Sequence, residues 1–223
     1  GNYGEGGGSL VRVALALSTL TGQEFKVTKI RSGRKVPGLK AQHLHAIKAL
    51  KQICNAQTND IEVGTTELEF KPGKIKSGTY EIDIGTAGSI SLLLQALILP
   101  CMFAPTKVTL KIKGGTCGKW QAPVDYLQNV LLPHLQKFVN KIELKVIRRG
   151  YYPKGNGLVH LEIIPKYKLK DYQKFEQFSK ELKIPNIKLT KQGNLEQIRG
   201  IVNISAELEE RQVGERIQNA AQR

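Results

Sequence analysis

The sequence predicts an α/β (α+β) fold built from two copies of a compact unit, each with two helices packed on one face of a small mixed sheet. An order of loop, helix, strand, loop, helix and strand occurs twice before Pro165. Short matches recur at a spacing of 80 or 81 residues: Gly8-Ser9 with Gly88-Ser89, Lys26-Val27-Thr28 with Lys107-Val108-Thr109, and Ile61-Glu62-Val63 with Ile142-Glu143-Leu144. This period exceeds the roughly 20–50 residues of solenoid repeats, so the duplicated unit is larger.

The first copy, residues 1–84, starts with the glycine loop Gly4–Gly8. Its helices are expected at Ser9–Leu20, which is largely apolar, and at Leu39–Cys54, where apolar residues recur at helical spacing. The basic loop Arg31–Gly38 precedes the second helix. Strands are expected in four short segments: Phe25–Ile30, Ile61–Val63, Glu67–Phe70 and Tyr80–Ile84.

The second copy, residues 85–165, repeats the glycine loop at Gly85–Gly88 and has its second helix at Val124–Phe138. Residues 166–223 differ in character. Lys166–Lys191 is rich in lysine and lacks glycine, as expected of a linker or an unrelated insertion. Gln197–Ser205 is predicted to be a strand and Glu207–Gln222 a polar amphipathic helix. That helical pattern has no C-cap, so the chain looks cut short.

The charge balance points to a polyanionic partner. The chain has 34 basic and 19 acidic residues, a formal net charge of +15. A surplus of this size favours phosphate-rich partners, because neutralised phosphates release counterions. A merely soluble basic protein could have the same composition, so charge alone does not decide between the two interpretations.

The cysteines and the apolar segments indicate a cytoplasmic protein without a membrane partner. Cys54, Cys101 and Cys117 have no CxxC spacing, so neither a zinc site nor a disulfide framework is indicated. No secretory signal pattern is visible. The apolar stretch Leu92–Ala104 is too short to span a bilayer and is typical of a buried helix.

The glycine loop Gly4–Gly8 leads directly into a helix, an arrangement that brings backbone amides close to an anion. Ser9 occupies the third glycine position of a dinucleotide fingerprint, and Leu39 stands where a Walker motif requires lysine, so neither motif is present. From spacing alone, a tight strand-to-helix turn is about as good an interpretation.

Arg12 strengthens the anion interpretation, because it is the only charged side chain between Glu5 and Glu24. An arginine on so apolar a helix must be paired or face an anion. We favour a phosphate clamp, since guanidinium geometry suits bidentate phosphate binding, over an internal ion pair with Glu5. In the second copy, Gln95 is a similar lone polar group that is expected to lie on the corresponding helix face. An amide satisfied by the backbone is the equal alternative there.

Two basic loops are further candidates for binding phosphate. Arg31–Lys35 follows a strand at the edge of the sheet where α/β sites tend to form. Arg148–Tyr152 combines positive charge with aromatic rings on which bases could stack. None of the four histidines lies in a recognisable catalytic pattern, so none is assigned a catalytic role.

Several ordered segments together resemble the RNA 3'-terminal phosphate cyclase family. As an ordered set they are far more specific than any single glycine loop, and they cover residues 1–165 almost continuously. The matching stretches are Gly4–Gly8 with Arg12, Ile30–Arg34, Pro37–Leu39, Gln42–Leu44, Asp83–Ser89, Gly114–Thr116, Pro123–Tyr126 and Arg148–Pro153.

The resemblance implies tandem βαβαββ-type repeats. The first strand would lie before Gly1, and residues 166–223 would begin a third repeat and a smaller inserted α/β domain. It also implies a ligase of RNA processing that uses ATP to convert an RNA 3'-terminal phosphate to a 2',3'-cyclic phosphate. A histidine accepts AMP and passes it to the 3'-phosphate, and the neighbouring 2'-hydroxyl then displaces AMP.

The resemblance also gives roles to residues of this chain. Arg12, Arg34 and Gln42 would form the pocket for phosphate and RNA, and Gln95 and Pro123 would contact ATP. Glu5 would bind the ATP phosphates or a divalent metal, Mg or Mn. The sequence departs from the family at Ala122, where many relatives have a second proline, and this puts that stacking contact in doubt.

The AMP-accepting histidine of the family would lie beyond this chain, so the chain alone is expected not to adenylylate itself. A non-catalytic cyclase-like protein that binds RNA in ribosome assembly is an alternative. Retention of Glu5, Arg12, Arg34, Gln42 and Gln95 argues against it, and the histidine would decide. An enolpyruvyl-transferase-like enzyme also has repeated βαβαββ units, but its small-acid site fits the charge of +15 poorly.

Overall fold

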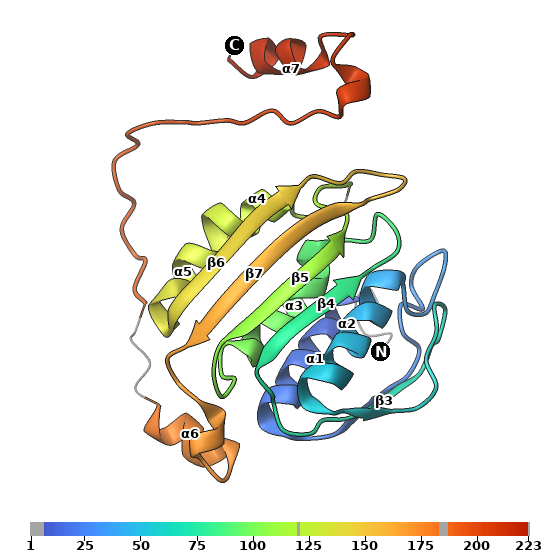
Figure 1. Ribbon diagram of the computed structural model, residues 1–223, viewed down its shortest axis with the longest axis vertical. Helices are drawn as coiled ribbons and strands as arrows, with labels where there is room; N and C mark the ends of the chain where they lie inside the picture. Colours follow the sequence, from blue (N-terminus) through green and yellow to red (C-terminus); the bar gives the residue numbers. More distant parts are fainter. Residues whose placement is uncertain (1–6, 120, 183–186, 223) are drawn as a thin grey trace. The chain divides into compact units, whose positions relative to one another are not determined.

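The computed structural model describes residues 7–119, 121–182 and 187–222. The chain divides into two compact units, residues 1–185 and 186–223. The first unit contains helices and mixed sheets, which confirms the predicted α/β class. Figure 1 labels its helices and strands.

The first copy contains two helices and a small antiparallel sheet. In chain order it consists of α1 (Ser9–Thr21), β1 (Phe25–Val27), α2 (Ala41–Cys54), β2 (Gln57–Thr58) and β3 (Leu68–Lys71). The sheet order is β1-β3-β2. Each helix ends where the backbone turns left-handed, α1 at Gly22 with φ 74° and α2 at Asn55 with φ 53°.

The strand predicted at Ile61–Val63 is wrong, because the chain turns there instead. The Glu62 amide donates to the Thr65 hydroxyl at 2.9 Å, and the Gly64 amide donates to the Leu39 carbonyl at 2.8 Å. A Cβ on Gly38 would overlap the backbone of Gly64, so this approach depends on glycine. The turn therefore holds the end of the basic loop against the start of α2.

The second copy follows the order βαβαββ in one mixed sheet. Its sheet order is β4-β5-β7-β6, with β4 parallel to β5 and the other pairs antiparallel. Residues 78–83, on the first-copy side of the boundary expected at residue 84, therefore pair with the second copy. The elements are β4 (Gly78–Asp83), α3 (Ile90–Cys101), β5 (Val108–Gly114), α4 (Val124–Tyr126), the π-helical η1 (Leu127–Leu131), α5 (Leu132–Leu135), the 3-10 turn η2 (Gln136–Phe138), β6 (Val139–Arg148) and β7 (Gly157–Pro165).

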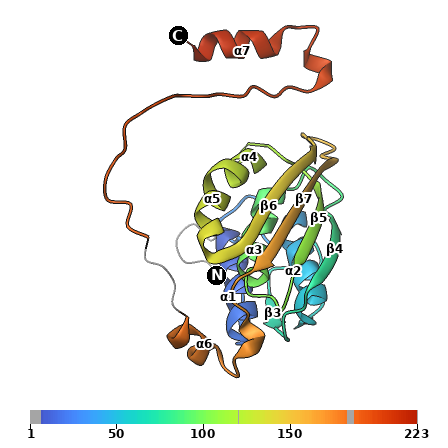
Figure 2. The ribbon, with the colours of Figure 1, turned by 60° about the vertical axis from the view of Figure 1, so that its left-hand side comes forward.

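The two faces of this sheet have different chemistry. Alternate residues of β5 and β7 are buried in the core, including Val108, Leu110 and Leu161. The opposite face carries ion pairs such as Lys111 with Glu81 at 2.9 Å. Figure 2 shows α4 and α5 lying along one side of β6 and β7. An antiparallel sheet with one face on the core and the other in solvent requires this alternation of buried apolar and charged residues along its strands.

The segment after β7 is folded onto the core, so the linker interpretation of Lys166–Lys191 is wrong for its first part. It contains η3 (Leu169–Asp171) and α6 (Phe175–Glu181). Phe178 is buried, and its ring centroid lies 5.2 Å from those of both Phe103 and Tyr172. These aromatic contacts hold the segment in place, although its charged residues face solvent.

The second unit contains η4 (Ala206–Leu208) and α7 (Val213–Ala221). Gln197–Ser205 does not form the predicted strand. Within residues 187–222 the structure contains no strand with which this segment could pair. The helix predicted at Glu207–Gln222 is confirmed only from Val213, since Gln212 has a left-handed φ of 50°. Within the described residues, no helix has the length and apolar character to cross a membrane.

Candidate phosphate-binding site

The glycine turn is described at Gly7 and Gly8, and both lie against side chains of the first copy. Gly4–Gly6, with Glu5, fall outside the described residues. A Cβ on Gly8 would overlap the His43 imidazole, so only glycine fits between this ring and the start of α1. A Cβ on Gly7 would lie 3.5 Å from Nη2 of Arg34. The turn therefore borders the basic loop and the second helix.

Arg12 and Gln95, predicted to lie on matching faces of their helices, are in direct contact. Nε of Arg12 donates to Oε1 of Gln95 at 2.8 Å. Burial lowers the pKa of Arg12, which still carries its charge at neutral pH because guanidinium pKa values are so high. Among the described residues, no carboxylate lies within ion-pair distance of Arg12. The contact with Gln95 fixes the Nε edge of the guanidinium.

His43 completes the site, although no role is predicted for it from the sequence. The backbone amide of Lys40 donates to Nδ1 of His43 at 3.1 Å, which puts the proton of the neutral ring on Nε2. Nε2 lies 3.3 Å from Nη1 of Arg12. Two N–H donors thus face the same spot, and an anion placed there would accept from both. Burial first, and then the charges of Arg12, Arg31 and Lys40, lower the pKa of His43 to about 4.

Three helix N-termini meet near this pair of donors. Helices α1, α2 and α3 each lack an acidic residue in the first turn. Gly8 precedes α1 and touches His43 near the start of α2, while a Cβ on Gly88, ahead of α3, would lie 3.7 Å from the Gln42 amide. Each N-terminus adds about half a positive charge, so their convergence favours a bound anion. Gln42 is half-buried within this group.

The two arginines of the basic loop differ in their contacts. Nη1 of Arg31 donates to the carbonyls of Val36 at 2.8 Å and Gly38 at 2.9 Å, so Arg31 holds the loop together. Arg34 is exposed, and its guanidinium lies beside Gly7. The structure thus brings Arg34 to the glycine turn, as the phosphate-pocket prediction requires.

The loop before α4 is tied to the start of α3. Ser89 caps α3 by accepting from the Leu92 amide at 3.1 Å. The Ser91 hydroxyl donates to the Ala122 carbonyl at 2.6 Å. Ser91 lies one helical turn before Gln95, so Pro123 follows a residue anchored beside the Gln95 face of α3.

The second basic loop is occupied by internal contacts. Both Nη atoms of Arg149 donate to the Asp125 carboxylate, at 2.8 and 2.7 Å. Nε of Arg148 donates to the Asn156 carbonyl at 2.8 Å. Through this pair the hydrogen-bonded Asp125 carboxylate raises the pKa of Arg149, and Arg149 lowers the pKa of Asp125. The loop predicted to bind nucleic acid is therefore braced by its arginines.

A metal site cannot be traced through the described residues. No group of three or more His, Cys, Asp or Glu side chains there is arranged to hold a metal ion. The predicted metal residue, Glu5, lies outside the described residues. The role of His43 could have been noticed in the sequence, because Gln42-His43 opens a helix whose first turn lacks any acid.

Comparison with known proteins shows the family of the chain. The sequence model of the RNA 3'-terminal phosphate cyclase family matches residues 3–220. The chain belongs to this family. It is 44% identical over 201 residues to an RNA 3'-terminal phosphate cyclase of Methanopyrus kandleri, covering 90% of this chain and 53% of the relative.

Other cyclases agree over a shorter stretch. The one from Pyrococcus furiosus is 51% identical over 159 residues, 71% of this chain and 46% of its own length. The one from Archaeoglobus fulgidus is 47% identical over 165 residues, 74% of this chain and 50% of its own length. The chain spans about half the length of the curated cyclases that it matches.

Proposed function

We propose that the chain provides the phosphate-binding part of an ATP-dependent enzyme that converts an RNA 3'-terminal phosphate to a 2',3'-cyclic phosphate. Family membership supports the reaction class. The observation that carries the proposal is the pair of donors on Arg12 and His43, 3.3 Å apart, at the meeting point of three helix N-termini. A terminal phosphate, with its two negative charges and several acceptor oxygens, matches this set of donors.

In the proposed reaction a histidine first takes AMP from ATP with release of pyrophosphate. An oxygen of the RNA 3'-phosphate then displaces the histidine from AMP, which makes AMP the leaving group of that phosphate. The neighbouring 2'-hydroxyl then attacks the same phosphorus. A P–O2' bond forms, the bond to AMP breaks, and the 2'-hydroxyl loses its proton. Charge accumulates on the phosphate oxygens in both steps at the RNA phosphate, and fixed donors aimed at these oxygens stabilise it.

The residues of the chain would divide this work. Nη1 of Arg12 and Nε2 of His43 would bind one phosphate oxygen, and Arg34 beside Gly7 would bind another. Gln95 would orient Arg12 and contact ATP, and Pro123 would form one wall of the adenine site. We propose Mg or Mn as the metal that neutralises the ATP phosphates, with Glu5 as its ligand.

His43 is unsuited to accept AMP, because both ring nitrogens are committed. Nδ1 accepts from the Lys40 amide, and Nε2 bears the ring proton. On His45, Nδ1 donates to the Ala41 carbonyl at 2.8 Å, which leaves the lone pair of the neutral ring on Nε2. We propose that the chain alone binds the RNA end without adenylylating itself, since none of its four histidines lies in a recognisable catalytic pattern.

The test compares two RNA oligonucleotides of the same sequence, one with a 3'-phosphate and one with a 3'-hydroxyl. Fluorescence anisotropy measures the Kd of each for the chain. We expect the 3'-phosphate to be preferred by about tenfold to a hundredfold, which corresponds to the roughly 1.5–3 kcal/mol of charged hydrogen bonds. Arg12→Gln should abolish the preference, and Lys48→Gln, which removes the same charge from an exposed site on α2, should retain it.

A second measurement addresses the reaction itself. The chain is incubated with 3'-phosphorylated RNA, ATP and Mg or Mn, and conversion is followed as phosphatase resistance of the RNA end. We expect binding without conversion by the chain alone. Equal Kd values for the two RNA ends would contradict the phosphate site, and a non-catalytic RNA-binding protein would then be the better description.

A further inference from the structure

A cleft lies at the opposite end of α1 from the phosphate site. It is formed by the last turn of α1, the segment before β4, the loop after α3 and residues 169–176. Its volume is about 670 Å³, large enough for a nucleobase with its sugar. Arg12 lies in the first turn of α1 and Thr21 ends it, so nine residues of helix, a rise of about 14 Å, separate the two places.

The cleft combines an aromatic interior with a basic rim. Phe103, Tyr172 and Phe175 line it, and Phe178, packed against all three rings, holds the aromatic group in place. The backbone amide of Leu169 also donates to the Phe103 carbonyl at 3.1 Å. The ring packing and this hydrogen bond therefore hold the aromatic side chains of the cleft in fixed positions.

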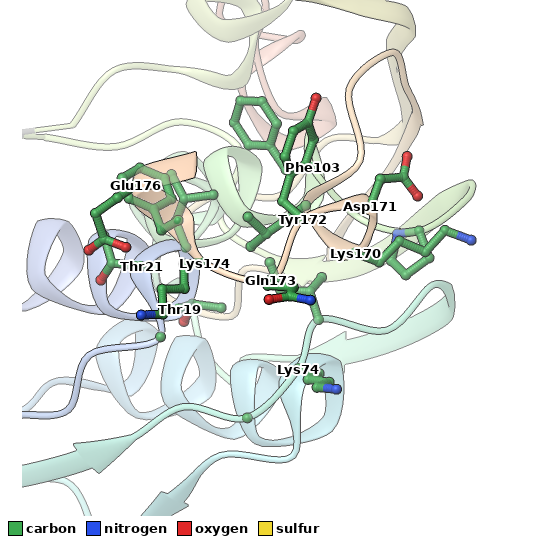
Figure 3. A pocket seen from close by; sticks show the side chains of 17 residues that line it. Thr19, Thr21, Lys74, Phe103, Lys170, Asp171, Tyr172, Gln173, Lys174 and Glu176 are labelled. Atoms are coloured by element: carbon green, nitrogen blue, oxygen red, sulfur yellow. The ribbon is translucent and has the colours of Figure 1, made fainter. Parts of the chain in front are cut away.

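The charged residues around the cleft are of both signs. Lys74, Lys170 and Lys174 line it together with Asp171 and Glu176. Figure 3 shows Thr19, Thr21 and Glu176 toward one end of the cleft and Lys170 and Asp171 toward the other. A ligand that fits this mixture carries negative charge for the lysines and N–H donors for the carboxylates and the carbonyl end of α1.

We propose that this cleft binds a nucleotide of single-stranded RNA upstream of the 3' end held at Arg12. A base would stack on the Phe175 and Tyr172 rings, its amino or imino N–H groups would face Asp171 or Glu176, and the lysines would take backbone phosphates. At the roughly 3.4 Å spacing of stacked nucleotides, about four nucleotides cover the distance of about 14 Å between the sites, and fewer suffice for an extended strand. The inference rests on the proposed function for the position of the 3' end.

The test compares 3'-phosphorylated RNAs of two and twelve nucleotides. The dinucleotide is too short to reach the cleft from Arg12, whereas the dodecamer reaches it. The triple variant K74Q/K170Q/K174Q is compared with K48Q/K137Q/K191Q, in which three exposed lysines elsewhere are neutralised to the same net charge. Thermal unfolding of both variants confirms that they are folded.

We expect the cleft variant to bind the dodecamer at least about fivefold more weakly than the control variant and to bind the dinucleotide equally well. The slope of log Kd against log salt should also decrease for the dodecamer alone. Phe175→Ala should weaken dodecamer binding by about fivefold or more, as expected from the loss of one stacked base.

A dodecamer with a 3'-hydroxyl separates this inference from the proposed function. If its binding depends on the cleft lysines while the 3'-phosphate gives no preference, the cleft is supported and the phosphate site is not. Equal dodecamer affinity in the two triple variants would overturn the cleft proposal, whatever the result at Arg12.

Discussion

The beginnings of α1 and α3 occupy corresponding places in the two copies, yet they carry different polar groups. Helix α1 presents Arg12, a cation without a carboxylate partner among the described residues. Helix α3 presents Gln95, a neutral amide whose oxygen accepts from Arg12 at 2.8 Å. Both side chains lie on helices whose neighbouring residues are mostly apolar. One copy thus supplies the charge, and the other supplies the group that orients it.

The difference matters because the site has to remain positively charged to bind an anion. A carboxylate at position 95 would neutralise Arg12, and an apolar residue would leave Nε without an acceptor. A neutral acceptor fixes the guanidinium and preserves its charge. The duplicated scaffold brings the two helices together, and the sequence difference between the copies makes the pair useful.

Acidification should change the free energy of unfolding most, and it should act through His43 of the first copy. The pKa of His43 is lowered to about 4 in the folded protein, against 6.5 in the unfolded chain. Between these values the unfolded chain binds a proton that the folded protein does not. The free energy of unfolding should therefore fall as the pH drops from about 7 to 4, by up to about 3 kcal/mol, and be unaffected by this group above pH 7.

Urea unfolding at a series of pH values measures this effect. His43→Gln should be less dependent on pH across the window, since the titrating group is gone, whereas His134→Gln, an exposed change, should behave like the native chain. An identical pH profile for native and His43→Gln proteins would show that His43 titrates normally, and the close packing of charges around it would then need another explanation.

Adding one methyl group to the glycine turn should cause the next largest loss of stability. In Gly8→Ala the new Cβ would overlap the His43 ring and would displace it from Arg12. Overpacking of this kind costs about 1–3 kcal/mol, and the 3'-phosphate preference should be lost with it. Gly7→Ala is the matched control, because its Cβ would make an ordinary contact with Arg34 at 3.5 Å. Similar unfolding curves for the two variants would contradict the tight approach at Gly8.

The sequence predicted the elements that depend on local pattern. The apolar runs and the spacing of 80 or 81 residues located the main helices and, in the second copy, the segments that begin β5 and lie within β6, but not β7. It failed where tertiary contacts decide. Ile61–Val63 matches Ile142–Leu144 in sequence, but only the latter has strand partners on the sheet. The close approach of Gly38 and Gly64 turns the former away.

The candidate site was likewise predictable only where local sequence pattern, rather than tertiary contacts, singles out a residue. Arg12 and Gln95 stood out because each is a lone polar group on an apolar helix. His43 did not, because its importance depends on the Lys40 amide at Nδ1 and on the space left by Gly8. The sequence predicts a phosphate-binding role for the loop that contains Arg149, because nothing in the sequence shows the pairing of Arg149 with Asp125.

Exchanging the neutral acceptor of the second copy tests its orienting role directly. In Gln95→Glu the carboxylate should pair with Arg12, so the protein should be more stable while its 3'-phosphate preference falls by about tenfold. In Gln95→Leu, the loss of one hydrogen bond should cost about 1 kcal/mol and reduce the preference only a few-fold. Anisotropy and urea unfolding of both variants provide the measurements. A Gln95→Glu protein with an unchanged preference would show that Gln95 does not control Arg12.

The smallest effect is expected at Asp125 in the second copy, whose charge is matched internally. Both side chains of the Arg149–Asp125 pair are 29% exposed, so solvent screening limits the loss in Asp125→Asn to below about 1 kcal/mol. The informative measurement is RNA affinity. If Arg149 can also bind phosphate, its release in Asp125→Asn should tighten RNA binding. The gain should exceed that of Glu24→Gln, which removes an equal charge at an exposed position. If Arg149 only braces the loop, the two variants should bind RNA equally, and the anion-binding role stays with the first copy.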